Sequence, residues 1–144
     1  MLLLIWGIVL IKSITPEQLA ASGSEDGHQL AVFCWAAINL VHYPDLKWLH
    51  HSPNGGSRHK VEAGKLKAMG VKSGWPDIIL PVRICGWAGL VIELKKPGRE
   101  RHKDGGLELE QIEWLDHFSK QGYQCYVCYH WEEAILKIQN YLEQ

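Results

Sequence analysis

Apolar runs divide the chain into short segments, and the two clearest runs lie near its centre. Residues 77–82 (DIILPV) and 89–94 (GLVIEL) are apolar and rich in β-branched side chains, and a turn bounded by Gly86 and Gly89 separates them. Two such runs joined by a glycine-bearing turn are typical of an antiparallel hairpin. We therefore expect this hairpin to form the centre of the fold.

The remaining segments predict five helices and two further strands around this hairpin. Thr15-Pro16 and Ser24 with its following acidic residues are typical helix starts. We expect helices over 15–23, 24–41, 58–69, 109–122 and 131–143, and strands over 46–51 and 123–129. The order α-α-β-α-β-β-α-β-α predicts an α/β domain with a mixed central sheet flanked by helices.

The last two predicted helices are amphipathic, and their apolar residues recur at helical spacing. These residues are expected to face the core. They are Leu109, Ile112, Leu115 and Phe118 in the first of the two, and Ala134, Ile135, Ile138 and Leu142 in the second.

Composition and charge limit the classes of function. The chain has 144 residues, enough for one domain with a core, and its formal net charge is -1. A basic field over the whole molecule is thereby excluded, so any contact with a polyanion must come from local patches. The four cysteines are too few for a disulfide framework in a secreted domain, which indicates a reducing, cytoplasmic setting.

Cys125 and Cys128 have the spacing of half a zinc knuckle. They lie in a predicted strand, however, where residues three apart point to opposite faces. We therefore expect these cysteines to pack in the structure, and a zinc-binding interaction domain is the less favoured alternative.

The first residues, MLLLIWGIVLI, are apolar but too few to span a bilayer, which takes about 20 residues. They lack the basic region and cleavage site of a signal peptide. We expect no membrane partner and treat residues 1–14 as an N-terminal extension. It could pack on the core as an edge strand or helix, make a weak membrane or partner contact, or simply precede the domain at 15–144.

Three charged residues at the ends of the hairpin strands are candidates for a catalytic site. Glu93 and Lys95 are two apart and share one face of their strand, and Asp77 begins the neighbouring strand. In a hairpin the start of one strand faces the end of the next, so Asp77 and Glu93 can hold a cation such as Mg²⁺ or Mn²⁺. Taken alone, the three are also compatible with solvated strand ends.

A longer string of motifs carries a family resemblance. Pro76-Asp77 and Glu93-x-Lys95 look like the signature of PD-(D/E)xK nucleases. The ordered segments HSPNGGSR (51–58), EAGKLKAMGVKSGWPDIILP (62–81), GLVIELK (89–95), EQIEWL (110–115), GYQCYVC (122–128) and EAILKIQNYL (133–142) resemble the VRR-NUC branch of that superfamily. The resemblance spans roughly residues 15–144 and is similar to the small stand-alone form often found in phage genomes. It implies a restriction-endonuclease-like mixed sheet.

The resemblance also implies roles for single residues. Asp77 and Glu93 would be metal ligands together with the backbone carbonyl of Leu94, and Lys95 would be the catalytic lysine. Glu25 would complete the metal shell, and Gln111 would lie near the substrate phosphate or the lysine. The implied cofactor is Mg²⁺ or Mn²⁺.

Gln29 follows Glu25 by one turn on the same helix face, which makes it a secondary candidate.

Two groups of residues are predicted to contact DNA. Glycine-rich turns and helix N-termini present backbone N–H groups to anions, and basic loops attract phosphates. The first group is His51, Asn54, Gly55, Gly56, Arg58 and Lys60, and the second is Lys96, Arg99 and Arg101. Neither group has a base-reading pattern, so we expect recognition of the DNA backbone and shape.

The sequence therefore predicts a divalent-metal-dependent DNA endonuclease that cuts branched or junction DNA in repair, recombination or phage replication. By resemblance to junction-cleaving relatives, it is expected to act as a homodimer. The main alternative is a module that binds DNA, or partners a nuclease, without catalysis.

Overall fold

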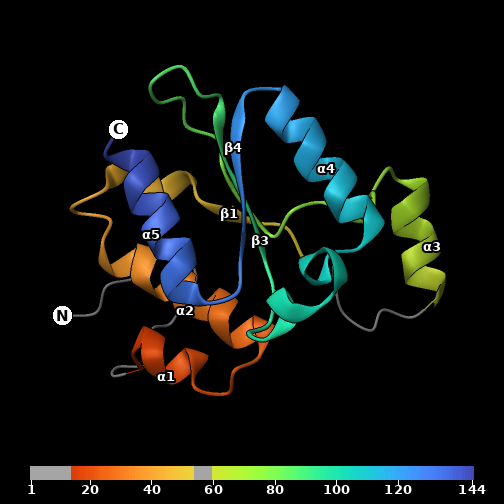
Figure 1. Cartoon of the computed structure of the whole chain (residues 1–144), viewed down its shortest axis with the longest axis horizontal. Coiled ribbons are helices and arrows are strands. Elements are labelled where there is room, and N and C mark those ends of the chain that lie inside the picture. Colours follow the sequence, from red (N-terminus) through yellow and green to blue (C-terminus); the bar gives the residue numbers. More distant parts are fainter. Residues whose placement is uncertain (1–13, 54–59) are drawn as a thin grey trace.

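The computed structural model describes residues 14–53 and 60–144, and it confirms the predicted order of helices and strands (Figure 1). The elements are α1 (Pro16–Ala20), α2 (Glu25–Ile38), η1 (Pro44–Trp48), β1 (His50–His51), α3 (Lys60–Ala68), β2 (Ile78–Leu80), β3 (Gly89–Leu94), η2 (Arg99–Arg101), η3 (Lys103–Gly106), α4 (Leu109–Lys120), β4 (Tyr123–Cys128) and α5 (Trp131–Leu142). Here η marks a 3₁₀ helix.

The extension predicted over residues 1–14 lies outside the described residues except for Ile14. No helix in the part of the chain that the structure describes is long and apolar enough to cross a membrane.

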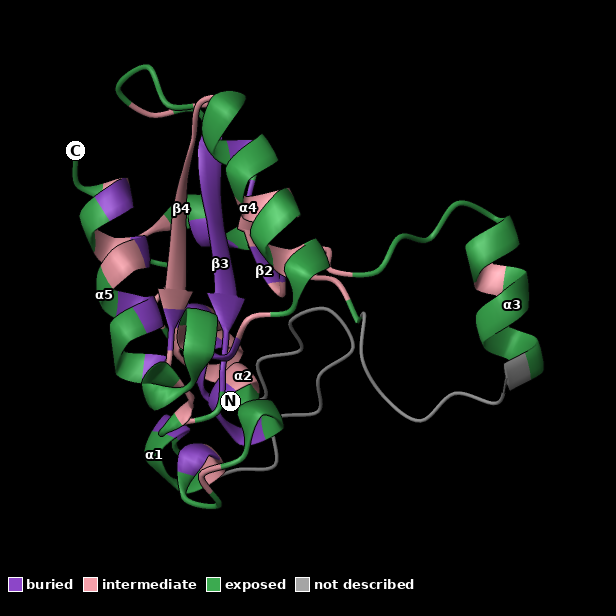
Figure 2. Cartoon of the chain, turned by 45° about the vertical axis from the view of Figure 1, so that its right-hand side comes forward, coloured by how far each residue is buried: buried purple, intermediate pink, exposed green. Residues whose placement is uncertain are grey.

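The sheet is mixed, as predicted, with strand order β1-β2-β3-β4. Strands β1, β2 and β3 are antiparallel neighbours, and β3 and β4 are parallel. Every residue of β3 is buried, and the strand is purple along its length in Figure 2. A charged residue in β3 therefore has little access to water, and its partners must come from the protein or from a ligand.

Helices cover both faces of the sheet. Helix α5 packs on β3 and β4 together with α2, whereas α4 packs on the same strands from the other side (Figures 1 and 2). Parallel neighbours need a crossover, and here α4 supplies it between β3 and β4. As a result, the start of α4 returns to the end of β3, and the starts of α2 and β2 lie near that end too.

Two details of the predicted elements are wrong. The predicted strand over 46–51 is shorter than expected: its residues 46–48 belong to η1, because Pro44 opens a helical turn, and only His50–His51 form β1. The inner stripe of α4 is also shifted: Leu109 is 68% exposed and Ile112 is 36% exposed, whereas Phe118 is buried. The first turn of α4 faces a polar region near β3, so its apolar residues point outward.

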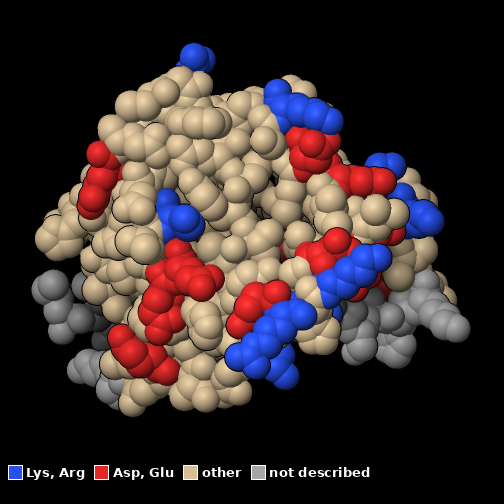
Figure 3. Space-filling view, viewed as in Figure 1, with Lys and Arg blue, Asp and Glu red and all other residues tan. Residues whose placement is uncertain are grey.

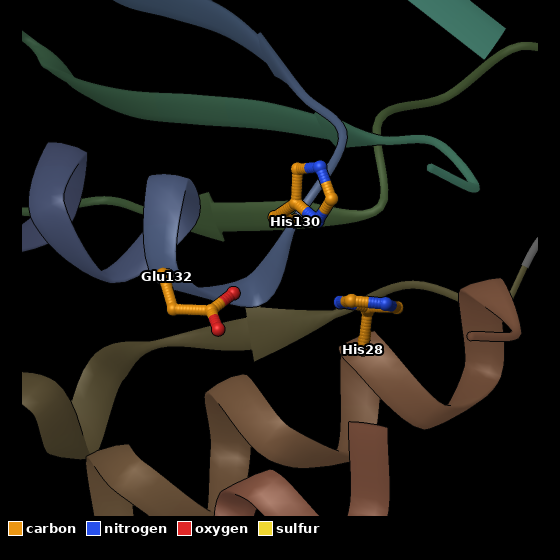
Figure 4. A group of neighbouring side chains, drawn as sticks. All are labelled: His28, His130 and Glu132. Carbon is orange, nitrogen blue, oxygen red and sulfur yellow. The ribbon is translucent and has the colours of Figure 1, made fainter. Parts of the chain in front are cut away.

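His28 joins α2 to α5. Its Nδ1 accepts a hydrogen bond from the backbone N–H of Trp131, the first residue of α5, at 3.0 Å. Figure 4 shows the His28 ring beside His130 and Glu132, with ring centroids of the two histidines 5.8 Å apart. Burial and the neighbouring His130 lower the pKa of His28, with Glu132 opposing them. Neutral His28 is therefore the form that stabilises the folded chain.

A pH dependence of stability follows from this contact. The pKa of His28 is lower in the folded chain than its ordinary value near 6.5, so the unfolded chain binds the proton more tightly. The stability that neutral His28 provides is complete above about pH 6.5 and decreases as the pH falls below it. Buried carboxyl groups with raised pKa values have the opposite pH dependence, so urea unfolding at several pH values should show this loss as a difference between the parent and a variant whose residue 28 does not titrate.

The control is His28→Asn, whose amide oxygen can accept the same N–H without titrating. This variant should lose less stability than the parent between pH 7 and pH 5. An equal loss in both proteins would show that His28 is not responsible.

Candidate active site

Asp77 and Glu93 lie opposite each other where the hairpin strands meet. Strand register pairs Ile78 with Ile92, so the residue before β2 faces the residue near the end of β3. The Asp77 and Glu93 carboxyl groups are within hydrogen-bonding reach of each other, and Asp77 Oδ2 accepts the backbone N–H of Leu94 at 2.8 Å. The structure thus brings together Asp77 and Glu93, the two carboxylates proposed from the sequence as metal ligands.

Glu93 and Lys95 point to the same side of their strand and meet Gln111 of α4. Lys95 Nζ lies 3.1 Å from Glu93 Oε1 and donates to Gln111 Oε1 at 2.9 Å. The amide nitrogen of Gln111 donates back to Glu93 Oε1 at 2.5 Å. Glu93 is 1% exposed and Lys95 is 8% exposed, so these two side chains have little access to water, whereas Gln111 is partly exposed.

Glu108 also contributes to this network, and the sequence analysis missed it. It is the N-cap residue of α4, and its backbone N–H donates to Gln111 Oε1 at 2.8 Å in a capping box. Gln111 is therefore held from both sides, by its own helix start and by the strand residues. The signal was present in the spacing of Glu108 and Gln111, since a capping box places a Glu or Gln three residues after the cap.

Glu25 comes from the first turn of α2 and completes the set. Glu25 is exposed as a whole residue, but partial burial of its carboxyl is the largest cause that raises its pKa, followed by the negative charge of Asp77. Lys95 and a hydrogen bond with the backbone of Lys96 oppose this rise. Glu25 therefore interacts with Asp77 and with Lys95 and Lys96, the two residues that follow β3.

The pKa values of the central carboxyls are also raised. Burial raises the pKa of Asp77, while the Leu94 N–H and Lys95 lower it. Burial and the charge of Asp77 raise the pKa of Glu93 to about 8, although Lys95 opposes them. Without a bound cation, the neighbouring protein groups therefore do not balance the negative charges of Asp77 and Glu93.

One oxygen shows where a cation would fit. Glu93 Oε2 is buried and has no hydrogen-bond partner among the residues that the structure describes. A buried carboxylate oxygen without a partner is costly, and beside Asp77 it forms a set of oxygen donors. Hard divalent cations such as Mg²⁺ and Mn²⁺ prefer such ligands. The residues present therefore fit a divalent cation bound between Asp77 and Glu93.

Of the residues predicted to contact DNA, some lie near Asp77, some lie on other elements, and some are outside the described part of the chain. His51 lies in β1, where its Nδ1 is 2.8 Å from the carbonyl oxygen of Asp77, so it belongs to the edge of this site. Lys60 begins α3, and Lys96, Arg99 and Arg101 follow β3. The predicted contacts at Asn54, Gly55, Gly56 and Arg58 lie outside the described residues.

Acidic and basic side chains are mixed on the surface that Figure 3 shows. Blue lysine and arginine side chains lie directly beside red carboxylates, in agreement with the net charge of -1. A large basic surface is not visible on this face, so DNA would be held by local contacts near the carboxylates.

A second group of possible metal ligands is less suitable for a cation. Ligand atoms of His28, His130 and Glu132 lie within 4.8 Å of one another. Nδ1 of His28 already accepts the Trp131 N–H, and its neutral ring then carries the proton on Nε2. Neutral His28 consequently has no free lone pair for a metal, and we interpret the group as a helix junction.

The two cysteines of the CxxC sequence do not form a metal site either. Cys125 is half-buried, Cys128 is buried, and both are free thiols. Burial raises the pKa of Cys125 to about 11 and that of Cys128 to about 12, so neither is a thiolate at neutral pH. This favours the packing role over the zinc-binding alternative.

Comparison with known proteins agrees with the geometry. Residues 42–131 match the family model described as "VRR-NUC domain". A solved structure titled "VRR_NUC domain protein" is 32% identical to the chain, with a TM-score of 0.67, and the match covers 83% of this chain and 88% of that one. The comparison with curated proteins found no match.

The burial of Glu93 predicts a stabilising substitution. Glu93→Gln removes the buried charge, and its amide can donate to Asp77. Because the pKa of Glu93 is raised on folding, the stability due to its protonated form is present at acid pH and is lost as the pH rises towards 8. Urea unfolding in EDTA should therefore show a gain for the variant of about 1–3 kcal/mol at pH 8.

The gain should be smaller at pH 5, where protonated Glu93 resembles glutamine. A variant that is less stable than the parent at pH 8 would contradict this account of the site.

Proposed function

Because this chain belongs to the VRR-NUC domain family, a nuclease family of the PD-(D/E)xK superfamily, we propose that it is a divalent-metal-dependent endonuclease that hydrolyses phosphodiester bonds in DNA. Family membership supports a DNA-processing nuclease in general terms. The observation that carries the finer proposal is the unpartnered buried oxygen of Glu93 beside Asp77, with Lys95 3.1 Å from the other oxygen.

The roles of the residues follow from their positions. Asp77 and Glu93 would bind the cation, with Glu25 and the carbonyl of Leu94 as further ligands. Bound there, Mg²⁺ or Mn²⁺ would supply a Lewis acid for the phosphate and lower the pKa of a coordinated water. Leu94 contributes twice, because its N–H also fixes the Asp77 carboxylate at 2.8 Å.

Lys95 would stabilise the charge that develops on the phosphate oxygens. Its ammonium group is held by Glu93 and by Gln111 Oε1, so its position is set before substrate arrives. Donors that are fixed in advance and shielded from water stabilise a transition state more than mobile ones do. Gln111 would act as the residue that positions Lys95 and Glu93 relative to each other.

Substrate contacts would come from the residues around this centre. His51 lies beside Asp77, Lys96 follows Lys95 directly along the chain, and Arg99 comes three residues after Lys96. Such contacts would bind phosphates of the DNA backbone. Work in the cytoplasm would agree with the free thiols of the four cysteines.

A module that binds DNA without catalysis is the second candidate. It would need basic contacts but no buried carboxylates, and Glu93 in the central strand destabilises the fold unless something binds it. The buried network of Glu93, Lys95 and Gln111 therefore favours an enzyme.

Removal of either central group should abolish cleavage. Lys95→Met and Asp77→Asn are expected to lower the rate of DNA nicking in Mg²⁺ or Mn²⁺ by about 10²–10³-fold or more, because the first removes a positive charge at the phosphate and the second removes a ligand of the cation. EDTA should stop the parent enzyme. The measurement is conversion of supercoiled plasmid to nicked circles.

Matched controls lie on α4. Lys120 and Asp116 form an exposed ion pair, and Lys120→Met and Asp116→Asn should cut like the parent. If Lys95→Met or Asp77→Asn also cuts at the parent rate, the assignment of the site is wrong.

We further propose that the chain acts as a homodimer on branched DNA. Helix α3 lies apart from the sheet in Figure 2, and a short helix of this kind has little stability alone. Val61 is 86% exposed and Met69 is 71% exposed, and a groove of about 830 Å³ between α3 and α4 is lined by Leu66 and Trp114. A second copy could cover these apolar groups and place two sites on two strands.

Light scattering should then give twice the chain mass of 16.4 kDa, and four-way junctions should be cut faster than plain duplex. Met69→Glu should shift the mass towards one chain, because it places a charge in the proposed contact. Val41→Glu is the control, since Val41 is 87% exposed on another part of the surface. A single-chain mass for the parent at all concentrations would rule out the homodimer.

A further inference from the structure

The amide nitrogen of Gln29 is buried, and it has no role in the function proposed above. Among the residues that the structure describes, two buried side-chain polar atoms lack a hydrogen-bond partner, Glu93 Oε2 and Gln29 Nε2. The first is explained by a cation between the carboxylates. An unpaired buried N–H is also unfavourable, which indicates an acceptor that Nε2 does not contact in this structure.

The neighbours of Gln29 on its helix show which way it faces. Glu25, Gln29 and Phe33 are four residues apart along α2 and form one row on its surface. Glu25 interacts with Asp77 and with the backbone of Lys96. At the other end of the row, the Phe33 ring lies 6.5 Å from the ring of His51.

His51 in turn contacts the carbonyl oxygen of Asp77 at 2.8 Å. Both neighbours of Gln29 in the row therefore face the surroundings of Asp77. Since Gln29 lies between them, its amide lies on the side of α2 that faces the proposed cation site.

We propose that Gln29 is a positioning residue whose Nε2 donates to the carboxylate of Glu25 and holds that carboxylate towards the bound cation. This inference rests on the proposed function, because it gives Glu25 its role as a ligand. Residues four apart on a helix are within reach of such a bond, and an ionised carboxylate can accept several. Ligating carboxylates are commonly fixed by a hydrogen bond of this kind.

The test uses Gln29→Met, which keeps the length and helix propensity of the side chain but removes the donor. Calorimetric titration of the full chain with Mn²⁺ should show about 10-fold weaker binding in the variant, as expected for the loss of such a hydrogen bond. The urea midpoint of the metal-free variant should equal or exceed that of the parent, because an unpaired buried donor has been removed.

A double-mutant cycle shows whether the effect passes through Glu25. In a Glu25→Ala background, Gln29→Met should change Mn²⁺ affinity by less than 2-fold, since the acceptor is already gone. The inference is overturned if Gln29→Met leaves Mn²⁺ affinity unchanged, if its effect is the same without Glu25, or if the metal-free variant is less stable than the parent.

Asp77→Asn separates this inference from the proposed function. If Asp77→Asn loses Mn²⁺ binding and cleavage while Gln29→Met binds Mn²⁺ like the parent, the metal site stands and only the role of Gln29 fails. If Asp77→Asn keeps both Mn²⁺ binding and cleavage, the proposed function itself fails.

Discussion

The burial of Glu93 in the central strand is the constraint on which the rest of the site depends. Every residue of β3 is buried, so a carboxylate there must be balanced by neighbouring groups. Lys95 provides one positive charge and Gln111 one amide donor, both to the same oxygen. The other oxygen has no partner in the described part of the chain, and nearby Asp77 adds negative charge. The fold thus leaves negative charge unbalanced at Asp77 and Glu93.

The connections of the chain explain why this deficit lies where several elements meet. The antiparallel hairpin brings Asp77 to Glu93, and the parallel pairing of β3 and β4 requires α4 as a crossover whose start returns to the same end of β3. The capping box of α4 then orients Gln111, so the first turn of α4 is polar on the face that an amphipathic helix would keep apolar. Leu109 and Ile112 are exposed for that reason.

Much of this arrangement could be predicted from local patterns. Strand alternation places Glu93 and Lys95 on one face, and hairpin geometry brings Asp77 opposite Glu93, so two apolar runs and their turn were sufficient. Gln111 and Glu25 could be included only through the family resemblance, because helix periodicity gives no distance to a strand in another part of the chain. Periodicity also failed for α4, since it assumes that the inner face is apolar, whereas Gln111 turns that face polar. The link between His28 and Trp131 could not be foreseen, because it joins residues far apart in sequence through packing of α2 on α5.

Helix α2 connects the stability of the fold with the geometry of the site. Its buried face is anchored to α5, since His28 accepts the first N–H of that helix at 3.0 Å. Glu25 precedes His28 by less than one turn, so the anchor that fixes the height and rotation of α2 also fixes Glu25 relative to Asp77. A neutral His28 is therefore required by the anchor, while charged carboxylates are required at the proposed cation site. A bound cation would lower the pKa values of the site carboxyls, which burial raises, so both requirements would be met at neutral pH. The fold and the proposed chemistry therefore favour the same pH.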